Sequence, residues 1–278
     1  MLVNLNAVLK RAQVEKYGVG LFNTTDSDML QAVIEAAEEC CSPVIIGTAE
    51  VLLPYGELSL IAPSVIEAAK RASVPVVVHY DHGLTFARCM EALKLGFSSV
   101  MFDGSIGEYA ENAAKTREIV KIAHAFGATV EGEIGHVGQA ETGDGEVSDR
   151  YTTLAEAQQY LYDTGVDALA IAIGTAHGAY KTKPKLDFAR LAQISGAIDT
   201  PLVLHGGSGL SDDDFRNAIA GGIAKVNIFT DLCIAGDNAL KAAFSDGLSY
   251  LDARNRKVEG IKAEVIRKMR LFGSVGKA

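Results

Sequence analysis

Short apolar runs alternate with longer helical patterns along the whole 278-residue chain. The runs are rich in valine and isoleucine and nearly continuous in apolar residues, which is typical of parallel strands covered on both faces. They predict strands over residues 19–23, 43–48, 75–81, 98–103, 128–135, 168–174, 201–207 and 224–230. Apolar residues at helical spacing fill the segments between these runs. Several of those segments end at a glycine, where helices commonly stop: Gly96, Gly127 and Gly165.

Strands that each precede a helix predict an α/β fold of the parallel (β/α)8 type, the TIM barrel. A doubly wound open sheet is the alternative that the alternation leaves open. Neither a linker nor a low-complexity stretch interrupts the pattern, so residues 1–278 are interpreted as a single domain. The segment after Asp246 is expected to form an extra C-terminal helical segment, packed outside the barrel or against a partner. Ser211 and Asp214 predict a capping box at the start of a helix.

The charge balance narrows the possible partners. A net charge of -9 disfavours binding to nucleic acid or to an anionic membrane. No apolar run approaches the roughly 18 residues of a membrane span, and residues 1–18 resemble an amphipathic helix rather than a signal peptide. We therefore expect a cytoplasmic protein. The cysteines match no metal or disulfide spacing and are expected to be reduced, buried thiols: Cys40, Cys41, Cys89 and Cys233.

Polar residues gather where the predicted strands end. In a (β/α)8 barrel these ends meet at one mouth, where the active site lies. One polar strand end is usually a satisfied cap, but so many converging ends are difficult to explain by capping alone. The residues concerned are Asn23, Thr48, Asp81, His82, Asp103, Glu133, His177, His205 and residues 227–230.

Three of the histidines belong to this set, at the ends of the third, sixth and seventh predicted strands: His82, His177 and His205. A single histidine at a strand end is more often a hydrogen-bonded structural residue. Three neutral imidazoles with one open position, however, form the arrangement of catalytic zinc. Their convergence at one mouth therefore favours metal binding. Of the remaining histidines, His79 is a candidate for the barrel interior, His124 for the surface and His136 for the neighbourhood of the site.

Three carboxylates accompany these histidines. Asp81 directly precedes His82, so it is a candidate for proton exchange with a bound alcohol, or for a hydrogen bond that orients a ligand histidine. Asp103 and Glu133 end the next two predicted strands. They are candidates for a second cation site or for holding the ligand histidines.

Glycine-rich segments follow the seventh and eighth predicted strands, at residues 205–214 and 225–231. Many barrels bind a phosphate there with backbone N–H groups and a helix N-terminus. Gly178 adds another position for close backbone approach. These segments predict phosphate recognition, although tight turns that need positive φ also explain glycines.

Eight motifs together resemble the class II, zinc-dependent ketose-bisphosphate aldolases, which include the fructose- and tagatose-bisphosphate aldolases. They cover nearly the whole chain in the correct order, and the Asp-His, Thr-Ala-His-Gly and His-Gly-Gly-Ser segments are specific in combination. The motifs are GLFNTTD (20–26), HYDHG (79–83), VMFDGS (100–105), VEGEIGHVG (130–138), AIGTAHGAYK (172–181), LVLHGGSG (202–209), KVNIFTD (225–231) and FGSVGKA (272–278).

The resemblance implies a reversible cleavage of a ketose (bis)phosphate into dihydroxyacetone phosphate and an aldehyde, through a zinc-stabilised enediolate. It implies Zn²⁺ on the three histidines, a monovalent cation such as Na⁺ or K⁺, and a homodimer or homotetramer. Asp81 would exchange the hydroxyl proton, and Glu141 would transfer a proton at the carbon that becomes the enediolate. Asp103 and Glu133 would assist a mobile or second metal. The substrate would be held by Asn23, Gly178, Gly206, Gly207, Ser208, Asn227, Ile228, Phe229 and Thr230.

The chain departs from this family at the distal end of the substrate. Family members that cleave bisphosphates bind the distal phosphate with an arginine of the C-terminal segment, for which Arg254 and Arg256 are loose matches. Residues 47–58, after the second predicted strand, also match poorly. Two alternatives therefore stay open: an aldolase for an atypical phosphorylated ketose with a different aldehyde half, and a non-catalytic partner subunit of an aldolase.

Overall fold

The computed structural model describes residues 1–139, 151–178, 180 and 183–278. Eight parallel strands close into a barrel, and each barrel strand is hydrogen-bonded to two neighbours, including the pairs β11–β2 and β4–β5 that complete the ring. This closure confirms the (β/α)8 prediction and excludes the open sheet. The strands are β2 (Val19–Asn23), β3 (Val44–Ala49), β4 (Val76–Gly83), β5 (Ser99–Phe102), β6 (Thr129–Ile134), β8 (Ala168–Ile171), β10 (Leu202–Leu204) and β11 (Ile223–Ile228).

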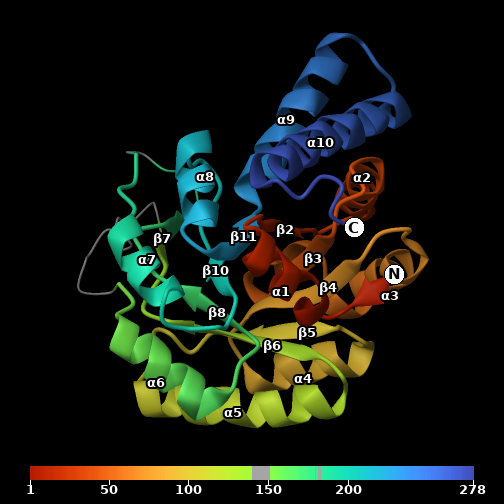
Figure 1. Ribbon diagram of the computed structural model, residues 1–278. Helices are drawn as coiled ribbons and strands as arrows, with labels where there is room; N and C mark the ends of the chain where they lie inside the picture. The colour runs from red at the N-terminus through yellow and green to blue at the C-terminus, as the bar shows by residue number, and fades with distance from the viewer. Residues whose placement is uncertain (140–150, 179, 181–182) are drawn as a thin grey trace.

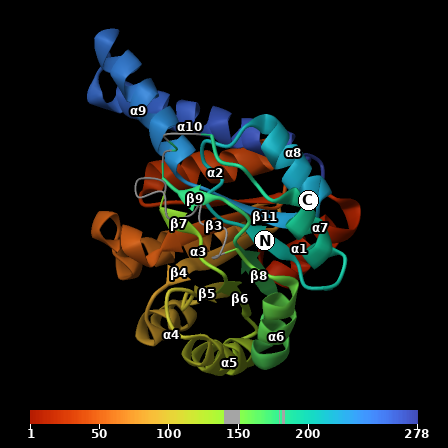
Figure 2. The ribbon, with the colours of Figure 1, turned by 90° about the vertical axis from the view of Figure 1, so that its left-hand side faces the viewer.

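An outer layer of helices covers the barrel (Figures 1 and 2). A short 3₁₀ helix, η1 (Glu50–Tyr55), separates β3 from its helix. Gly96 and Gly165 end two helices in the left-handed conformation, and Ser211 and Asp214 form the capping box expected from the sequence. The outer helices are α2 (Ser27–Glu39), α3 (Leu58–Arg71), α4 (Phe86–Leu95), α5 (Tyr109–Ala125), α6 (Leu154–Thr164), α7 (Phe188–Ser195), α8 (Asp212–Ala220) and α9 (Thr230–Ser245).

The N-terminal segment closes one end of the barrel. Strand β1 (Leu2–Val3) pairs with the start of β4, and helix α1 (Leu5–Glu15) follows it. The apolar face of α1 packs against inward-facing side chains near the strand starts, which gives this end an apolar core. The opposite end, where the strands finish, is left for polar side chains.

The C-terminal helix α10 (Tyr250–Phe272) lies outside the barrel, as the sequence predicted. It packs against α9 and α2, and the α9–α10 pair extends away from the strands (Figure 1). None of the described helices combines the length and the apolar character that crossing a bilayer requires.

The cysteines only partly follow the expectation of burial. All four are free thiols, and Cys40 and Cys89 are buried. Cys233 is half-buried and Cys41 is exposed, so the expectation was wrong for these two. Cys41 lies in the turn between α2 and β3, where it has a positive φ of 46°.

Candidate active site

A cavity of about 340 Å³ lies at the carboxyl ends of the barrel strands. All nine residues that the resemblance assigned to substrate binding line it, from Asn23 at the end of β2 to Thr230 at the start of α9. Asp81, His82, Asp103 and His177 line it as well. Residues that lie more than 200 positions apart in the sequence are therefore brought to one mouth, as expected for this fold.

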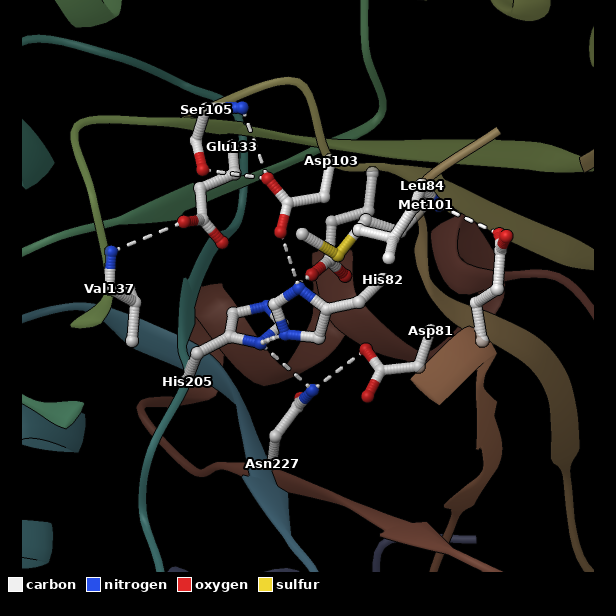
Figure 3. Close-up of polar contacts among 12 residues, drawn as sticks. Asp81, His82, Leu84, Met101, Asp103, Ser105, Glu133, Val137, His205 and Asn227 are labelled. Atoms are coloured by element: carbon white, nitrogen blue, oxygen red, sulfur yellow. Dashed lines mark hydrogen bonds and ion pairs between the residues drawn. The ribbon is translucent and has the colours of Figure 1, made fainter. Parts of the chain in front are cut away.

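The three predicted ligand histidines form one cluster at this mouth. Each can direct a ring nitrogen to a common point, since the nitrogens of His82, His177 and His205 lie within 4.8 Å of one another. His82 Nε2 is 2.7 Å from His205 Nδ1 (Figure 3). His177 Nε2 is buried without a hydrogen-bond partner among the described residues. Burial and the neighbouring His82 and His205 lower the pKa of His177 to about 3, so its imidazole is neutral.

An irregular end of β4 makes the consecutive residues Asp81 and His82 both available to the site. Side chains alternate between the faces of a regular strand, so neighbours would point in opposite directions. The register of β4 against β5 shifts between Tyr80 and Gly83, and His82 adopts a positive φ of 43°. Backbone strain of this kind at a non-glycine residue is common at functional sites.

Asp81 is a buried carboxylate held by two amides. Its Oδ2 accepts a hydrogen bond of 2.8 Å from Asn23 Nδ2, and its Oδ1 accepts one of 2.9 Å from Asn227 Nδ2. Burial would raise the pKa of Asp81, but the positive charges of His82 and Lys225 outweigh it and hold that pKa well below its usual range. The group is therefore an ionised base with a fixed orientation.

The carboxylates of Asp103 and Glu133 lie on the other side of His82 (Figure 3). Asp103 Oδ2 is 2.8 Å from His82 Nδ1, and Ser105 donates a hydrogen bond of 2.7 Å to Asp103 Oδ1. Burial and the charge of Asp103 raise the pKa of Glu133 to about 8. Oxygens of Asp103 and Glu133 and a nitrogen of His82 lie within 4.8 Å of one another, so they form a second group that could hold a cation.

A network of charged side chains inside the barrel contacts His205. Most of this network was not predicted from the sequence. Glu131 Oε1 is 2.8 Å from His205 Nε2, and Lys225 Nζ is 2.7 Å from Glu131 Oε2, all fully buried. His79 also lies in the barrel interior, as expected, with its Nε2 3.8 Å from Glu131 Oε2 and 3.9 Å from Asp81 Oδ1. Strand parity could have placed both side chains inside the barrel, because Glu131 alternates with Glu133 and Lys225 with Asn227.

The glycine-rich segments form the part of the cavity wall next to β10 and β11. Gly206 has a φ of +65°, and a Cβ atom there would lie 2.4 Å from the backbone oxygen of Ala176. No other residue fits this close approach between the β8 and β10 loops. Ser208 Oγ accepts backbone hydrogen bonds from Phe229 (3.2 Å) and Asp231 (3.3 Å), which fixes the N-terminus of α9 at the cavity.

The remaining candidate residues differ in their position relative to the cavity. Glu141 falls outside the described residues. Neither Arg254 nor Arg256 lines the cavity, because Arg254 binds Asp28 and Gln31 of α2 and Arg256 binds Asp246. His136 lines the cavity, and His124 is a half-exposed surface residue paired with Asp167.

Apolar residues of the mouth were not foreseen. They come from η1 and from the loops after β4, β5 and β6, where no strand-end rule applies: Val51, Leu52, Leu84, Ile106 and Val137.

The fold and the cavity define a (β/α)8-barrel protein with a three-histidine cluster and an ionised aspartate at its mouth. The model of the family "Fructose-bisphosphate aldolase class-II" matches residues 3–277. The chain belongs to this family and is an aldolase-type lyase.

Named relatives divide between substrates. The chain is 39% identical to a fructose-bisphosphate aldolase of Thermus caldophilus over 100% of both chains. It is also 39% identical to a 6-phospho-5-dehydro-2-deoxy-D-gluconate aldolase of Shouchella clausii, over 99% of this chain and 96% of the relative. The crystal structure of the YdjI aldolase of Escherichia coli K12 superposes with a TM-score of 0.91 at 35% identity, covering 100% of both chains. Because the identities are equal, similarity alone does not choose among substrates.

Proposed function

We propose that this protein is a zinc-dependent aldolase that reversibly cleaves a ketose phosphate or bisphosphate into dihydroxyacetone phosphate and an aldehyde. The observation that carries the proposal is that three features lie together at one cavity. These are the histidine cluster, the buried ionised Asp81 beside it, and the glycine-rich wall at the N-terminus of α9. A carbon–carbon cleavage of this type needs an electrophile, a base and a place for the phosphate, and the cavity offers one candidate for each.

The histidine cluster suits Zn²⁺, which prefers nitrogen ligands in tetrahedral sites with one open position. His177 is neutral, and its buried Nε2 has no partner in the described part of the chain, as a ligand requires. Burial would lower the pKa of His82, but Asp81 and Asp103 raise it to about 10. Zinc would have to displace that proton, because a ligand imidazole binds metal in its neutral form. Bound zinc would act as a Lewis acid for the oxygens of the substrate. Asp103 and Glu133, with His82, are proposed to hold a second or transient cation.

The residues of the chain supply the proton transfers and the binding. In cleavage, Asp81 takes the proton from the hydroxyl on the carbon beyond the scissile bond. The carbon–carbon bond then breaks, and its electron pair stays on the dihydroxyacetone phosphate fragment. A proton must return to that carbon, and the family resemblance makes Glu141 the proposed donor.

The phosphate of the donor half is proposed to bind at Gly178, at residues 206–208 and at residues 227–230. The first turn of α9 begins at Thr230, and a helix N-terminus attracts an anion through its free N–H groups and its dipole. Asn23 and Asn227 have side-chain oxygens that are buried without a partner among the described residues, so both can accept substrate hydroxyls.

Other expectations remain part of the proposal: a monovalent cation such as Na⁺ or K⁺, a homodimer or homotetramer, a cytoplasmic location, no nucleic-acid or membrane partner, and one domain over residues 1–278. A non-catalytic partner subunit is the less supported reading, because such a subunit has no need for an ionised Asp81 beside three intact histidines. A Schiff-base route is disfavoured, since no lysine is among the described residues that line the cavity.

A coupled assay for dihydroxyacetone phosphate tests the proposal. The purified protein is incubated with a panel of ketose phosphates and bisphosphates that includes C4 epimers. At least one member is expected to release dihydroxyacetone phosphate at a rate proportional to enzyme concentration. If every member of the panel stays intact, the proposed reaction is wrong.

The buried Glu131–Lys225 pair gives a prediction about the support of His205. Glu131→Gln is expected to weaken zinc binding about 10- to 100-fold, because partners of ligand histidines fix their orientation and basicity. The same change leaves Lys225 without its counter-charge, so the free energy of unfolding should also fall, by about 3 kcal/mol or more.

The double variant Glu131→Gln/Lys225→Met separates the two effects. It should recover most of the free energy of unfolding while zinc affinity, measured by chelator competition, stays low. Recovery of zinc affinity together with stability would mean that Glu131 acts only through stability.

A further inference from the structure

The two sides of the cavity differ in chemistry. The side formed by the ends of β8, β10 and β11 consists mainly of histidine, glycine and polar residues, with Ile228 and Phe229 as its apolar members. The side formed by η1 and by the loops after β4, β5 and β6 is mostly apolar, and we call it the apolar wall: Val51, Leu52, Leu84, Ile106 and Val137. Since the donor phosphate is proposed to bind at the polar side, the aldehyde half of a ketose would lie against the apolar wall.

Three members of the apolar wall are large hydrophobic side chains on the surface. Their exposed fractions are 62% for Val51, 47% for Leu84 and 83% for Ile106. Scattered apolar residues on a surface need no explanation, but several around one cavity mouth mark a ligand-binding area. A substrate chain that covers them would remove apolar surface from water.

The wall is held in place by the carboxylate of Glu50, which is not among the residues that line the cavity. Glu50 Oε2 accepts a hydrogen bond of 2.8 Å from the backbone N–H of Leu84 and one of 3.1 Å from the Tyr80 hydroxyl. Glu50 also accepts a hydrogen bond of 3.2 Å from the Thr85 hydroxyl. These hydrogen bonds connect η1 to the end of β4. They therefore fix the position of Val51 and Leu52 relative to Leu84.

No cation faces this wall among the described residues. The described lining contains neither lysine nor arginine. Arg88, four residues after Leu84, has its guanidinium 3.1 Å from Glu57 and 2.7 Å from Glu91. Arg254 is bound to α2 instead, 2.8 Å from Asp28.

A second phosphate on this side would therefore have no counter-charge among the described residues. An unphosphorylated aldehyde needs no counter-charge, and its carbon chain gains contact with the wall.

Resting on the proposed function, we propose that the acceptor half of the site takes an uncharged, unphosphorylated aldehyde. The natural ketose then carries a single phosphate, on the dihydroxyacetone half, and the apolar wall determines this preference.

The condensation direction tests the proposal with the zinc-loaded protein and dihydroxyacetone phosphate. Glyceraldehyde and glyceraldehyde 3-phosphate form a matched pair that differs only in the phosphate. We expect kcat/KM to be at least about tenfold higher for glyceraldehyde. A ratio of one or less overturns the inference. Condensation that prefers the phosphorylated aldehyde leaves the proposed function intact, whereas no condensation with any aldehyde overturns the proposed function and the inference together.

A wall variant provides the second measurement. Ile106→Arg places a guanidinium at the exposed edge of the wall, and Ile106→Gln is the control that is polar but uncharged. The arginine variant is expected to raise kcat/KM for glyceraldehyde 3-phosphate about tenfold relative to the glutamine variant. Equal values for the two variants would mean that the aldehyde does not lie against the wall, which contradicts the inference.

Discussion

Replacing His177 with alanine is expected to remove the tightly bound zinc and to lower kcat/KM about 1,000-fold or more. A Lewis-acid metal contributes several kcal/mol to a reaction that develops negative charge, and about 1.4 kcal/mol corresponds to a tenfold change in rate. His177 is the most informative of the three proposed ligands, because its Nε2 has no hydrogen-bond partner among the described residues. Replacing His177 therefore removes a proposed ligand without breaking a hydrogen bond of its Nε2 to any described residue. Zinc content by elemental analysis and turnover in the coupled assay measure the two effects.

His124→Ala is the matched control for this experiment. His124 is half-exposed on α5 and pairs with Asp167 at 2.9 Å, away from the cavity. Zinc content and kcat/KM of this variant should stay within a factor of about two of the unaltered protein, as is usual for surface positions. If His177→Ala behaves like His124→Ala, the cluster does not hold the catalytic metal.

Asp81→Ala is expected to lower kcat about 100- to 10,000-fold while the zinc content stays close to that of the unaltered protein. General-base catalysis contributes a factor of this size, and Asp81 is the buried, ionised carboxylate beside the histidine cluster. The substitution leaves the amides of Asn23 and Asn227 without their acceptor, so some loss of stability is also expected.

Asp246→Asn serves as the control, because Asp246 lies at the end of α9 and makes an exposed pair with Arg256. Thermal unfolding of all variants separates a folding defect from a catalytic one. A parallel loss of zinc and activity in Asp81→Ala would identify Asp81 as an orienting residue rather than the base.

The barrel could be predicted from the sequence because each strand is a nearly continuous apolar run. Such runs are typical of strands that are covered on both faces. The site could be predicted because one rule of the fold brings strand ends together, so Asp81, His82 and His205 could be grouped although they are far apart in the chain. The same rule does not apply to loops. The apolar wall lies on η1 and on three loops, and a string such as EVLLPY (50–55) carries no signal of the cavity that it faces.

The ionic network around His205 and the positions of the C-terminal arginines were harder to predict from the sequence, for two different reasons. Lys225 and Glu131 are fully buried, and a charged residue within an apolar run gives no indication of its partner across the barrel. Arg254 was assigned from a loose motif match, whereas its position depends on how α10 packs against α2. Partner choice over such sequence distances is a property of tertiary packing rather than of local pattern.

The most direct test of the central claim is a zinc titration of the metal-stripped protein, followed by its aldolase activity. The protein is first treated with a chelator and dialysed, and dihydroxyacetone phosphate release is then measured as zinc is added in known equivalents. Without metal we expect no activity, and recovery should be complete near one equivalent of zinc per chain. Activity that is indifferent to chelation, or a covalent adduct trapped by borohydride on a lysine, would contradict the central claim.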